Sequence, residues 1–174
     1  YGGATVGHRL NVRMPLGLGV SLNAGIDGQA YLYDTRIDFP QLQGITIVPT
    51  SQSNGYATSA PGKITQVGTA FYFDGTFRRD RFELTAGTRI ELLHNNGANY
   101  TLVDPRLVGR VQLHRDATLV YASGIFHQPP PFFAQLPIVG NPQLAPQASW
   151  QSSVGVEFRL PWNLDARATA FYSQ

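Results

Sequence analysis

The sequence of 174 residues contains no cysteine, a single lysine (Lys63) and few charged side chains. Without cysteine, a disulfide framework, a thiolate metal site and a cysteine nucleophile are all excluded. Charged residues make up 14% of the chain, well below the roughly 25% of typical soluble proteins. The net charge is only +2 and the arginines are scattered, so no basic tract suggests binding to nucleic acid. No run approaches the roughly 18 apolar residues of a membrane helix.

The chain begins at Tyr1, with neither a start methionine nor a signal peptide. We therefore expect a mature form or an excised piece.

Apolar and polar residues instead alternate strictly along much of the chain. Between Leu18 and Leu32 the even positions are apolar or glycine, whereas the odd positions include Ser21, Asn23 and Asp27. Successive side chains of a strand point to opposite faces, so this pattern predicts a long strand with one apolar face. Eight such strands are expected, at residues 4–14, 18–32, 66–78, 81–92, 103–113, 117–127, 150–160 and 164–169. The phase of residues 117–127 is ambiguous, and no helix is predicted.

The lengths of the strands and of their connections suggest a membrane barrel. Many strands reach about ten residues, which a tilted strand needs to cross a bilayer. Tight turns are expected near Pro15, Asp80, Asp116 and Trp162. The intervening connections are an Asn-rich loop at 95–99 and longer loops at about 35–64 and 128–148. Short turns at one end and longer, extracellular loops at the other are typical of outer-membrane barrels.

We therefore expect an all-β fold: an antiparallel, up-and-down transmembrane β-barrel segment over residues 1–174. With the short turns on the periplasmic side, both chain ends would lie outside the cell, whereas intact bacterial barrels keep both termini in the periplasm. The expectation is therefore about eight consecutive strands of a larger barrel. Lone edge strands would leave backbone groups unpaired in hydrocarbon, at several kcal/mol each.

A soluble barrel, with its apolar face turned inward, shows the same alternation. Three features favour the membrane: the low charge content, the size of the side chains on the polar face, and aromatic residues near the predicted strand ends that would form an interfacial girdle. The expected girdle residues are Tyr31, Tyr33, Tyr72, Tyr121, Phe171 and Tyr172.

Four segments resemble the barrel of TonB-dependent outer-membrane receptors. They are FELTAGTR at 82–89, VDPRL at 103–107, YASGIFHQPP at 121–130 and GNPQLAPQ at 140–147. The first is similar to the strand of LTAGLR type that precedes the DPR segment in that family. Together the matches cover about residues 71–172, and their order and spacing carry the resemblance.

The resemblance implies a barrel of about twenty-two strands around a plug domain. It further implies the outer membrane of a Gram-negative bacterium, and TonB-dependent uptake of a large, scarce solute such as a ferric siderophore. Expected partners are membrane lipid, the solute, and the TonB complex through a plug that is not part of these residues. No nucleic acid, cofactor or enzymatic activity is expected.

Candidate ligand contacts lie in the predicted extracellular loops, where aromatic rings and amides adapt to a bulky solute. They are Tyr56, Phe132, Phe133, Gln135 and Asn141. The polar face carries arginines beside carboxylates, which predicts ion pairs along the barrel wall rather than acid–base catalysis. The expected lumen-facing residues are Arg9, Asp27, Arg89, Glu91, Asp104, Arg106, Arg110, Glu157 and Arg159. The four histidines are dispersed, so no metal site is expected.

Two other functions fit the sequence. One is a small structural or adhesive outer-membrane barrel without a transport role. The other is a soluble, lipocalin-like binding protein. A plug and further strands in the parent reading frame would favour the receptor, and solubility without detergent would favour the lipocalin-like protein.

Overall fold

The computed structural model describes residues 2–38, 59–135, 141 and 143–174. They form eight strands and two short 3₁₀ helices. These are β1 (Gly2–Gly17), β2 (Val20–Asp38), β3 (Ser59–Arg79), β4 (Phe82–Asn95), β5 (Ala98–His114), β6 (Ala117–Gln128), η1 (Phe132–Gln135), β7 (Gln147–Leu160), η2 (Pro161–Asn163) and β8 (Leu164–Ser173). None of the helices among these residues is long and apolar enough to cross a membrane.

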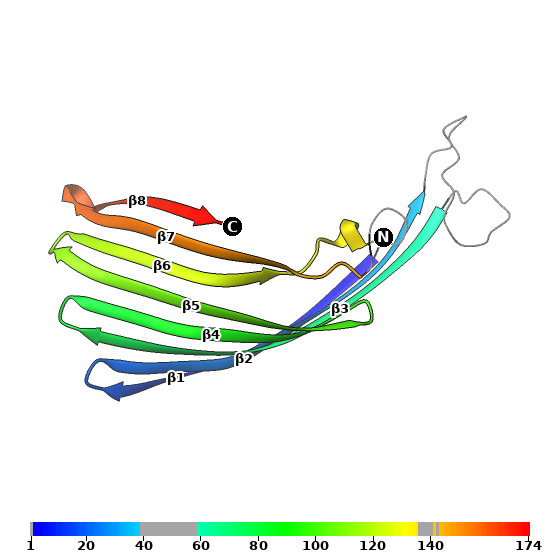
Figure 1. The fold of residues 1–174 in the computed structure, drawn as a ribbon, viewed down its shortest axis with the longest axis horizontal. Helices are drawn as coiled ribbons and strands as arrows, with labels where there is room; N and C mark the ends of the chain where they lie inside the picture. Colours follow the sequence, from blue (N-terminus) through cyan, green and yellow to red (C-terminus); the bar gives the residue numbers. More distant parts are fainter. Residues whose placement is uncertain (1, 39–58, 136–140, 142) are drawn as a thin grey trace.

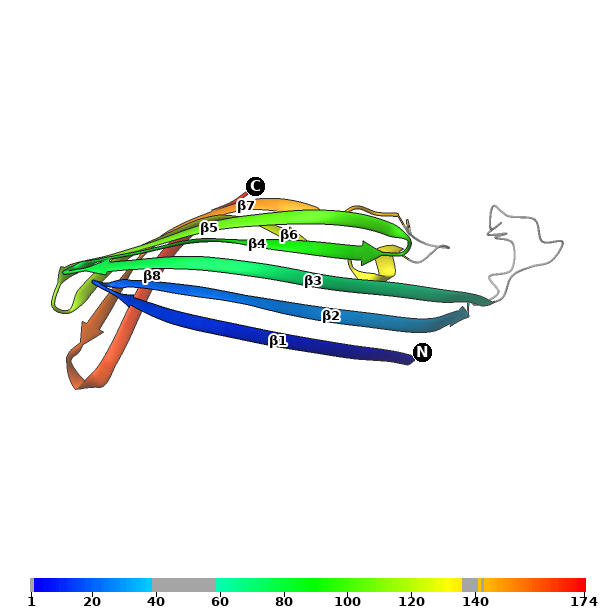
Figure 2. The same ribbon diagram turned by 90° about the horizontal axis from the view of Figure 1, so that it is seen from below.

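The strands form one antiparallel sheet in the order β1 to β8, so each pairs with its neighbour in sequence. The sheet is curved into a trough, and the β2–β3 hairpin projects furthest at one end (Figures 1 and 2). Within the described residues, β1 pairs only with β2 and β8 only with β7, which leaves the sheet open. The prediction of eight antiparallel strands in part of a barrel is confirmed.

Two of the hairpin turns have consecutive residues in left-handed backbone conformations. Asn96 (φ 48°) and Gly97 (φ 86°) join β4 to β5, as in the primed turns that Asn-Gly favours. The predicted loop at 95–99 is therefore a tight turn. Leu18 (φ 49°) and Gly19 (φ 78°) join β1 to β2 in the same way. Leu18 thus lies in the turn, and the strand predicted from Leu18 begins at Val20.

The predicted loops are shorter than expected. β2 continues to Asp38 and pairs there with Ser59 of β3, so both strands extend into the loop expected at 35–64. Tyr56 lies outside the described residues. In the loop expected at 128–148, η1 forms and β7 already begins at Gln147.

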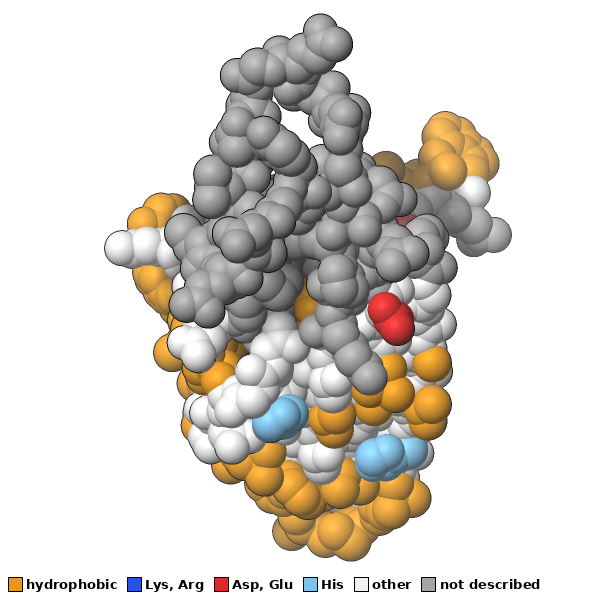
Figure 3. Space-filling view, turned by 90° about the vertical axis from the view of Figure 1, so that its right-hand side faces the viewer, with side chains coloured by type: hydrophobic (Ala, Val, Ile, Leu, Met, Phe, Trp, Pro, Cys, Tyr) orange, Lys and Arg blue, Asp and Glu red, His pale blue; other side chains and the backbone are white. Residues whose placement is uncertain are grey.

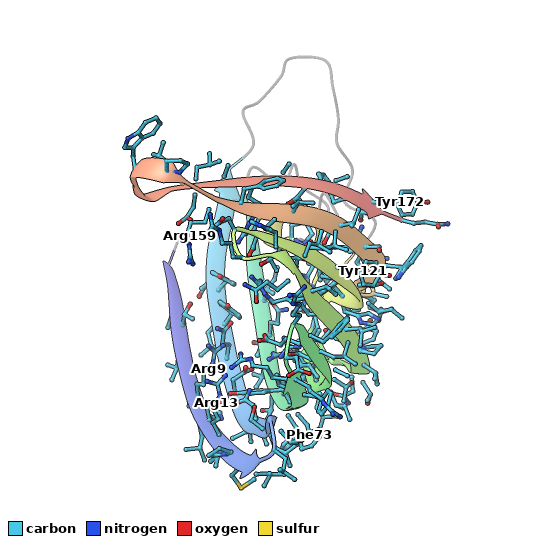
Figure 4. The ribbon with its side chains drawn as sticks, turned by 90° about the vertical axis from the view of Figure 1, so that its left-hand side faces the viewer. Arg9, Arg13, Phe73, Tyr121, Arg159 and Tyr172 are labelled. Carbon is cyan, nitrogen blue, oxygen red and sulfur yellow. The ribbon has the colours of Figure 1, made fainter. Side chains whose placement is uncertain are left out.

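The alternation separates the two faces of the sheet, because residues opposite each other in neighbouring strands share a face. One row across the sheet is polar or glycine: Arg13, Asn23, Asp74, Gly87, Arg106, Gly124, Gln151 and Ser173. The adjacent row is mostly apolar: Met14, Leu22, Gly75, Ala86, Leu107, Ser123, Ser152 and Tyr172. In Figure 4, Arg9, Arg13 and Arg159 lie on the concave side, whereas Phe73, Tyr121 and Tyr172 lie on the convex side.

This pairing also resolves the ambiguous strand. Tyr121 of β6 lies opposite Gly109 and Val154, so it belongs to the apolar face. The girdle prediction was only partly right. Tyr121 and Tyr172 lie on the apolar face, where Trp150 meets Tyr172 edge to face at a centroid distance of 5.8 Å. The other four expected girdle residues lie on the polar face: Tyr31, Tyr33, Tyr72 and Phe171.

Few hydrophobic side chains are buried. Among the described residues these are Ile64, Ala70, Leu93 and Leu102. Many large apolar side chains on the convex face are exposed, including Val6 (70%) and Phe71 (51%). Seen from the end that carries the β2–β3 hairpin, hydrophobic side chains follow the lower outer border of the molecule (Figure 3). A largely apolar surface of this kind suits contact with lipid rather than water.

A polar pocket on the concave face

An ion-pair cluster links three strands of the concave face. Arg89 of β4 donates to the Asp27 carboxylate of β2 over 2.7 Å and to Glu91 over 3.2 Å. Arg9 of β1 lies 3.5 Å from the same Asp27 carboxylate. Asp27 and Glu91 face each other across Ala70 of β3, whose small side chain leaves room for the charged groups above it. The cluster is therefore held together across β1 to β4.

Further charged pairs continue along this face. Arg106 contacts Asp74 at 2.6 Å. Arg110 and Arg167 both donate to Glu157. His127 Nδ1 lies 2.5 Å from Asp104 Oδ1. The structure thus places the expected lumen-facing residues on one face, and brings all but Arg159 into ion pairs or charged hydrogen bonds among the described residues.

Beside the Asp27 cluster lies a pocket of about 540 Å³, which we name the outer pocket. It is lined by residues from β1 to β4, from the end of β6 and from the segment that follows β6. They are Arg9, Asp27, Gln29, Tyr31, Tyr33, Ile64, Gln66, Gly68, Arg89, Glu91, Leu93, Gln128, Pro129, Pro130 and Gln135. The segment after β6 therefore folds back over the concave face.

Gln135 of η1 closes this pocket and is only 1% exposed. Its amide nitrogen donates to the Pro130 carbonyl over 2.7 Å. Its amide oxygen has no hydrogen-bond partner among the described residues. A buried acceptor without a donor lowers the stability of the fold.

The other expected ligand contacts are not brought into the pocket. Asn141 is exposed, and its side-chain oxygen accepts a hydrogen bond from the Gln143 backbone over 3.0 Å. Phe132 and Phe133 belong to η1, but their side chains are outside the described part. Tyr56 is outside it altogether.

Sequence reasoning missed most of the lining. The odd phase of β2 could have assigned Gln29, Tyr31 and Tyr33 to the polar face, but the tyrosines were assigned to a girdle instead. Gln128 ends β6, whose phase was ambiguous in the sequence. Gln135 carries no such signal, because its place depends on how the segment after β6 folds back. Within the described residues, no group of three His, Asp or Glu side chains is placed to hold a metal ion.

A family model described as "TonB dependent receptor-like, beta-barrel" matches residues 2–174. Among curated proteins, none matches the chain.

Solved structures match the fold. The FrpB iron transporter from Neisseria meningitidis (F3-3 variant) has a TM-score of 0.72 and 15% identity, over 98% of this chain and 28% of that one. The copper transporter OprC has a TM-score of 0.72 and 15% identity, over 98% of this chain and 29% of that one. A mutant of the ferric enterobactin receptor PfeA from Pseudomonas aeruginosa has a TM-score of 0.65 and 18% identity, over 98% of this chain and 26% of that one. The chain thus spans less than a third of these proteins, and the likeness shows the fold alone.

Proposed function

Since this chain belongs to the family of TonB-dependent receptor-like β-barrels, we propose that it forms part of the wall of a receptor for a large, scarce solute such as a ferric siderophore. The family lies in the outer membrane of Gram-negative bacteria, and its members are transporters rather than enzymes. Uptake by the receptor would depend on TonB.

The observation that carries this proposal is the two-faced sheet matched by the family over nearly its whole length. Its convex face is apolar, with exposed residues such as Val6 and Phe71. Its concave face carries the ion pairs and the outer pocket. A strand of this pattern separates lipid from a polar lumen. A small closed barrel finds no support, since β1 and β8 do not pair with each other in the described residues.

Arginines of the barrel wall that have no carboxylate partner support the presence of a further domain inside the lumen. Arg13 of β1 and Arg159 of β7 have no ion-pair partner among the described residues, and both lie on the concave side (Figure 4). Both are exposed, and a plug with acidic side chains would pair with them. Contact with TonB would then be made through that plug.

Support for iron as the cargo comes from relatives of similar fold, whose names refer to an iron transporter and a ferric enterobactin receptor. The copper transporter OprC has the same fold, so the fold does not choose between cargoes.

The test is uptake of radioactive iron by iron-starved cells, supplied as a series of ferric chelates. Deleting the receptor gene should abolish uptake of at least one chelate, and a plasmid copy should restore it only in cells that have TonB. Diffusion of a small sugar through porins serves as the control. Uptake that persists without TonB, or that does not depend on the receptor, would contradict the proposal.

A further inference from the structure

Strands β5 and β6 separate at Pro105. Their last paired residues are Arg106 and Gly124. Beyond that point β5 stays paired with β4 and β6 with β7, so the two strands diverge toward the end that carries the β2–β3 hairpin (Figure 1). The Pro105 carbonyl faces β6, since a Cβ atom on Gly124 would lie 2.9 Å from its oxygen. The N–H and C=O of one strand residue face the same neighbour. Because proline has no N–H, the β5–β6 pairing ends there.

A side-chain hydrogen bond joins the two strands beyond this fork. His127 Nδ1 of β6 lies 2.5 Å from Asp104 Oδ1 of β5. Both side chains are mostly buried, at 19% and 14% exposed. Among the described residues, no other side chain pairs with Asp104. The pair therefore links β5 to β6 where their backbone pairing has stopped.

The charged groups around this pair are unequal in number. At this level of the concave face, the arginines and carboxylates are Arg9, Arg89, Asp27, Glu91 and Asp104. Arg89 lies opposite Asp104 in the β4–β5 register, but it is engaged by Asp27 and Glu91. Two arginines are thus set against three carboxylates, and an imidazolium at His127 would supply the missing positive charge.

The other neighbours of the pair do not supply that charge. Arg106, two residues further along β5, is held by Asp74. On β7 the residue opposite His127 is Ala148, and on β3 the residue opposite Arg89 is Tyr72. The residues after His127 are a glutamine and three prolines. Histidine changes its charge between about pH 5 and 8, so the strength of the pair depends on pH in this range.

The segment that begins directly after His127 forms a stiff arm, which we define as residues 128–135. Its sequence starts Gln-Pro-Pro-Pro, and proline rings restrict φ. At its other end the Gln135 amide nitrogen donates to the Pro130 carbonyl over 2.7 Å. Pro130 and Gln135 are both buried and line the outer pocket. Because the arm is stiff, the pair at its base determines the direction in which it crosses the concave face.

We propose that Asp104 and His127 form a proton-dependent clasp at the base of the arm. When His127 is protonated, a hydrogen bond between two charged groups holds the arm over the outer pocket. When His127 is neutral, the bond is weaker and the arm leaves this position more often. The clasp itself does not depend on the cargo. That it senses the pH outside the cell rests on the proposed function, which places this end of the strands there.

Distances between two spin labels test the clasp in the whole receptor, in lipid vesicles with the same buffer inside and outside. Nitroxides at Ala134→Cys in η1 and Thr101→Cys in β5 report the position of the arm. Double electron–electron resonance at pH 5.5 should give one narrow distance distribution. At pH 8.0 a second population should appear, and the ratio of the first to the second should fall about fivefold, the order expected when one of two charges in a hydrogen-bonded pair is lost. Distances that do not respond to pH, or respond in the opposite direction, would overturn the proposal.

Three further substitutions assign the response to this pair. His127→Lys keeps a positive charge at both pH values and should keep the narrow distribution at pH 8.0. Asp104→Asn removes the carboxylate and should abolish the pH response. His94→Ala is the matched control, because His94 bonds Asn99 over 2.8 Å and does not contact Asp104. It should respond as the unchanged receptor does.

Gel mobility before and after boiling shows which variants are folded. A pH response retained in folded Asp104→Asn receptor, or lost in His94→Ala, would overturn the assignment. TonB-dependent uptake judges the receptor function separately, because neither the labels nor the vesicles require transport.

Discussion

The guanidinium of Arg106 on β5 reaches across β4 to the carboxylate of Asp74 on β3. Arg106 Nε donates to Oδ1 over 2.9 Å, and Nη2 donates to Oδ2 over 2.6 Å. Asn23 of β2 donates to the same carboxylate over 3.2 Å. Gly87 lies between the two charged residues in the row. One carboxylate thus joins side chains of β2, β3 and β5 across the intervening β4.

This relationship predicts that Gly87 cannot carry a side chain. A Cβ atom there would lie 2.0 Å from Asp74 Oδ1 and 2.6 Å from the Phe73 carbonyl oxygen. Gly87→Ala should therefore lower the free energy of unfolding by about 1–3 kcal/mol, as expected for overpacking. Urea unfolding in detergent micelles measures it. Gly75→Ala is the control, since its nearest neighbour would be 3.7 Å away. Equal losses in both variants would contradict this account.

Much of the fold could be predicted from the sequence, because the position of a residue along a strand determines the face of the sheet on which its side chain lies. This worked for β2, where Asn23 and Asp27 alternate with apolar residues. It failed for β6, because Val120 and Ala122 on the polar face are as apolar as Leu119 on the other.

The strand ends and the pocket could not be predicted in this way. β2 runs on to Asp38, but the alternation that identifies a strand ends at Leu32. The burial of Gln135 depends on its contact with Pro130 and on strands distant in sequence. Likewise, nothing in the sequence around Gly87 indicates that the Asp74–Arg106 ion pair passes over this glycine.

The β1–β2 turn contains a residue that suits it poorly. Leu18 has φ 49° and is 99% exposed. A left-handed conformation costs most residues about 1–2 kcal/mol, and less for Asn. Leu18→Asn should therefore stabilise the protein by about 1 kcal/mol in the same unfolding experiment. Leu16→Asn, two residues earlier at the end of β1 and without a positive φ, should give no such gain. A loss of stability in Leu18→Asn would show that the leucine side chain has a packing role.

The two faces should tolerate charge differently. Ala24 lies on the apolar face and Asn23 on the polar face, next to Asp74. Ala24→Arg should cost about 2–4 kcal/mol if the site lies near the bilayer midplane. Asn23→Arg should cost much less, because the new charge would face Asp74. Unfolding from lipid vesicles measures both, and a larger loss for Asn23→Arg would reverse the assignment of the faces.

The chain has no cysteine, so single introduced cysteines report topology without background. Asn141, which is exposed, follows η1, and Leu18 lies in a turn at the opposite end of the strands. Gln135 is unsuitable because it is buried. A bulky, membrane-impermeant maleimide should label Asn141→Cys on whole cells, and Leu18→Cys only after the outer membrane is permeabilised. Labelling with the opposite pattern would invert the model of extracellular loops.

The central claim is that the convex face contacts lipid while the concave face lines a wet lumen. Nitroxide labels along β2, in the receptor in lipid vesicles, test it most directly through their collision rates with oxygen and with a polar nickel chelate. Labels at positions 22, 24 and 26 should collide more with oxygen, and those at 21, 23 and 29 more with the nickel chelate. The reverse phase, or no alternation, would contradict the account.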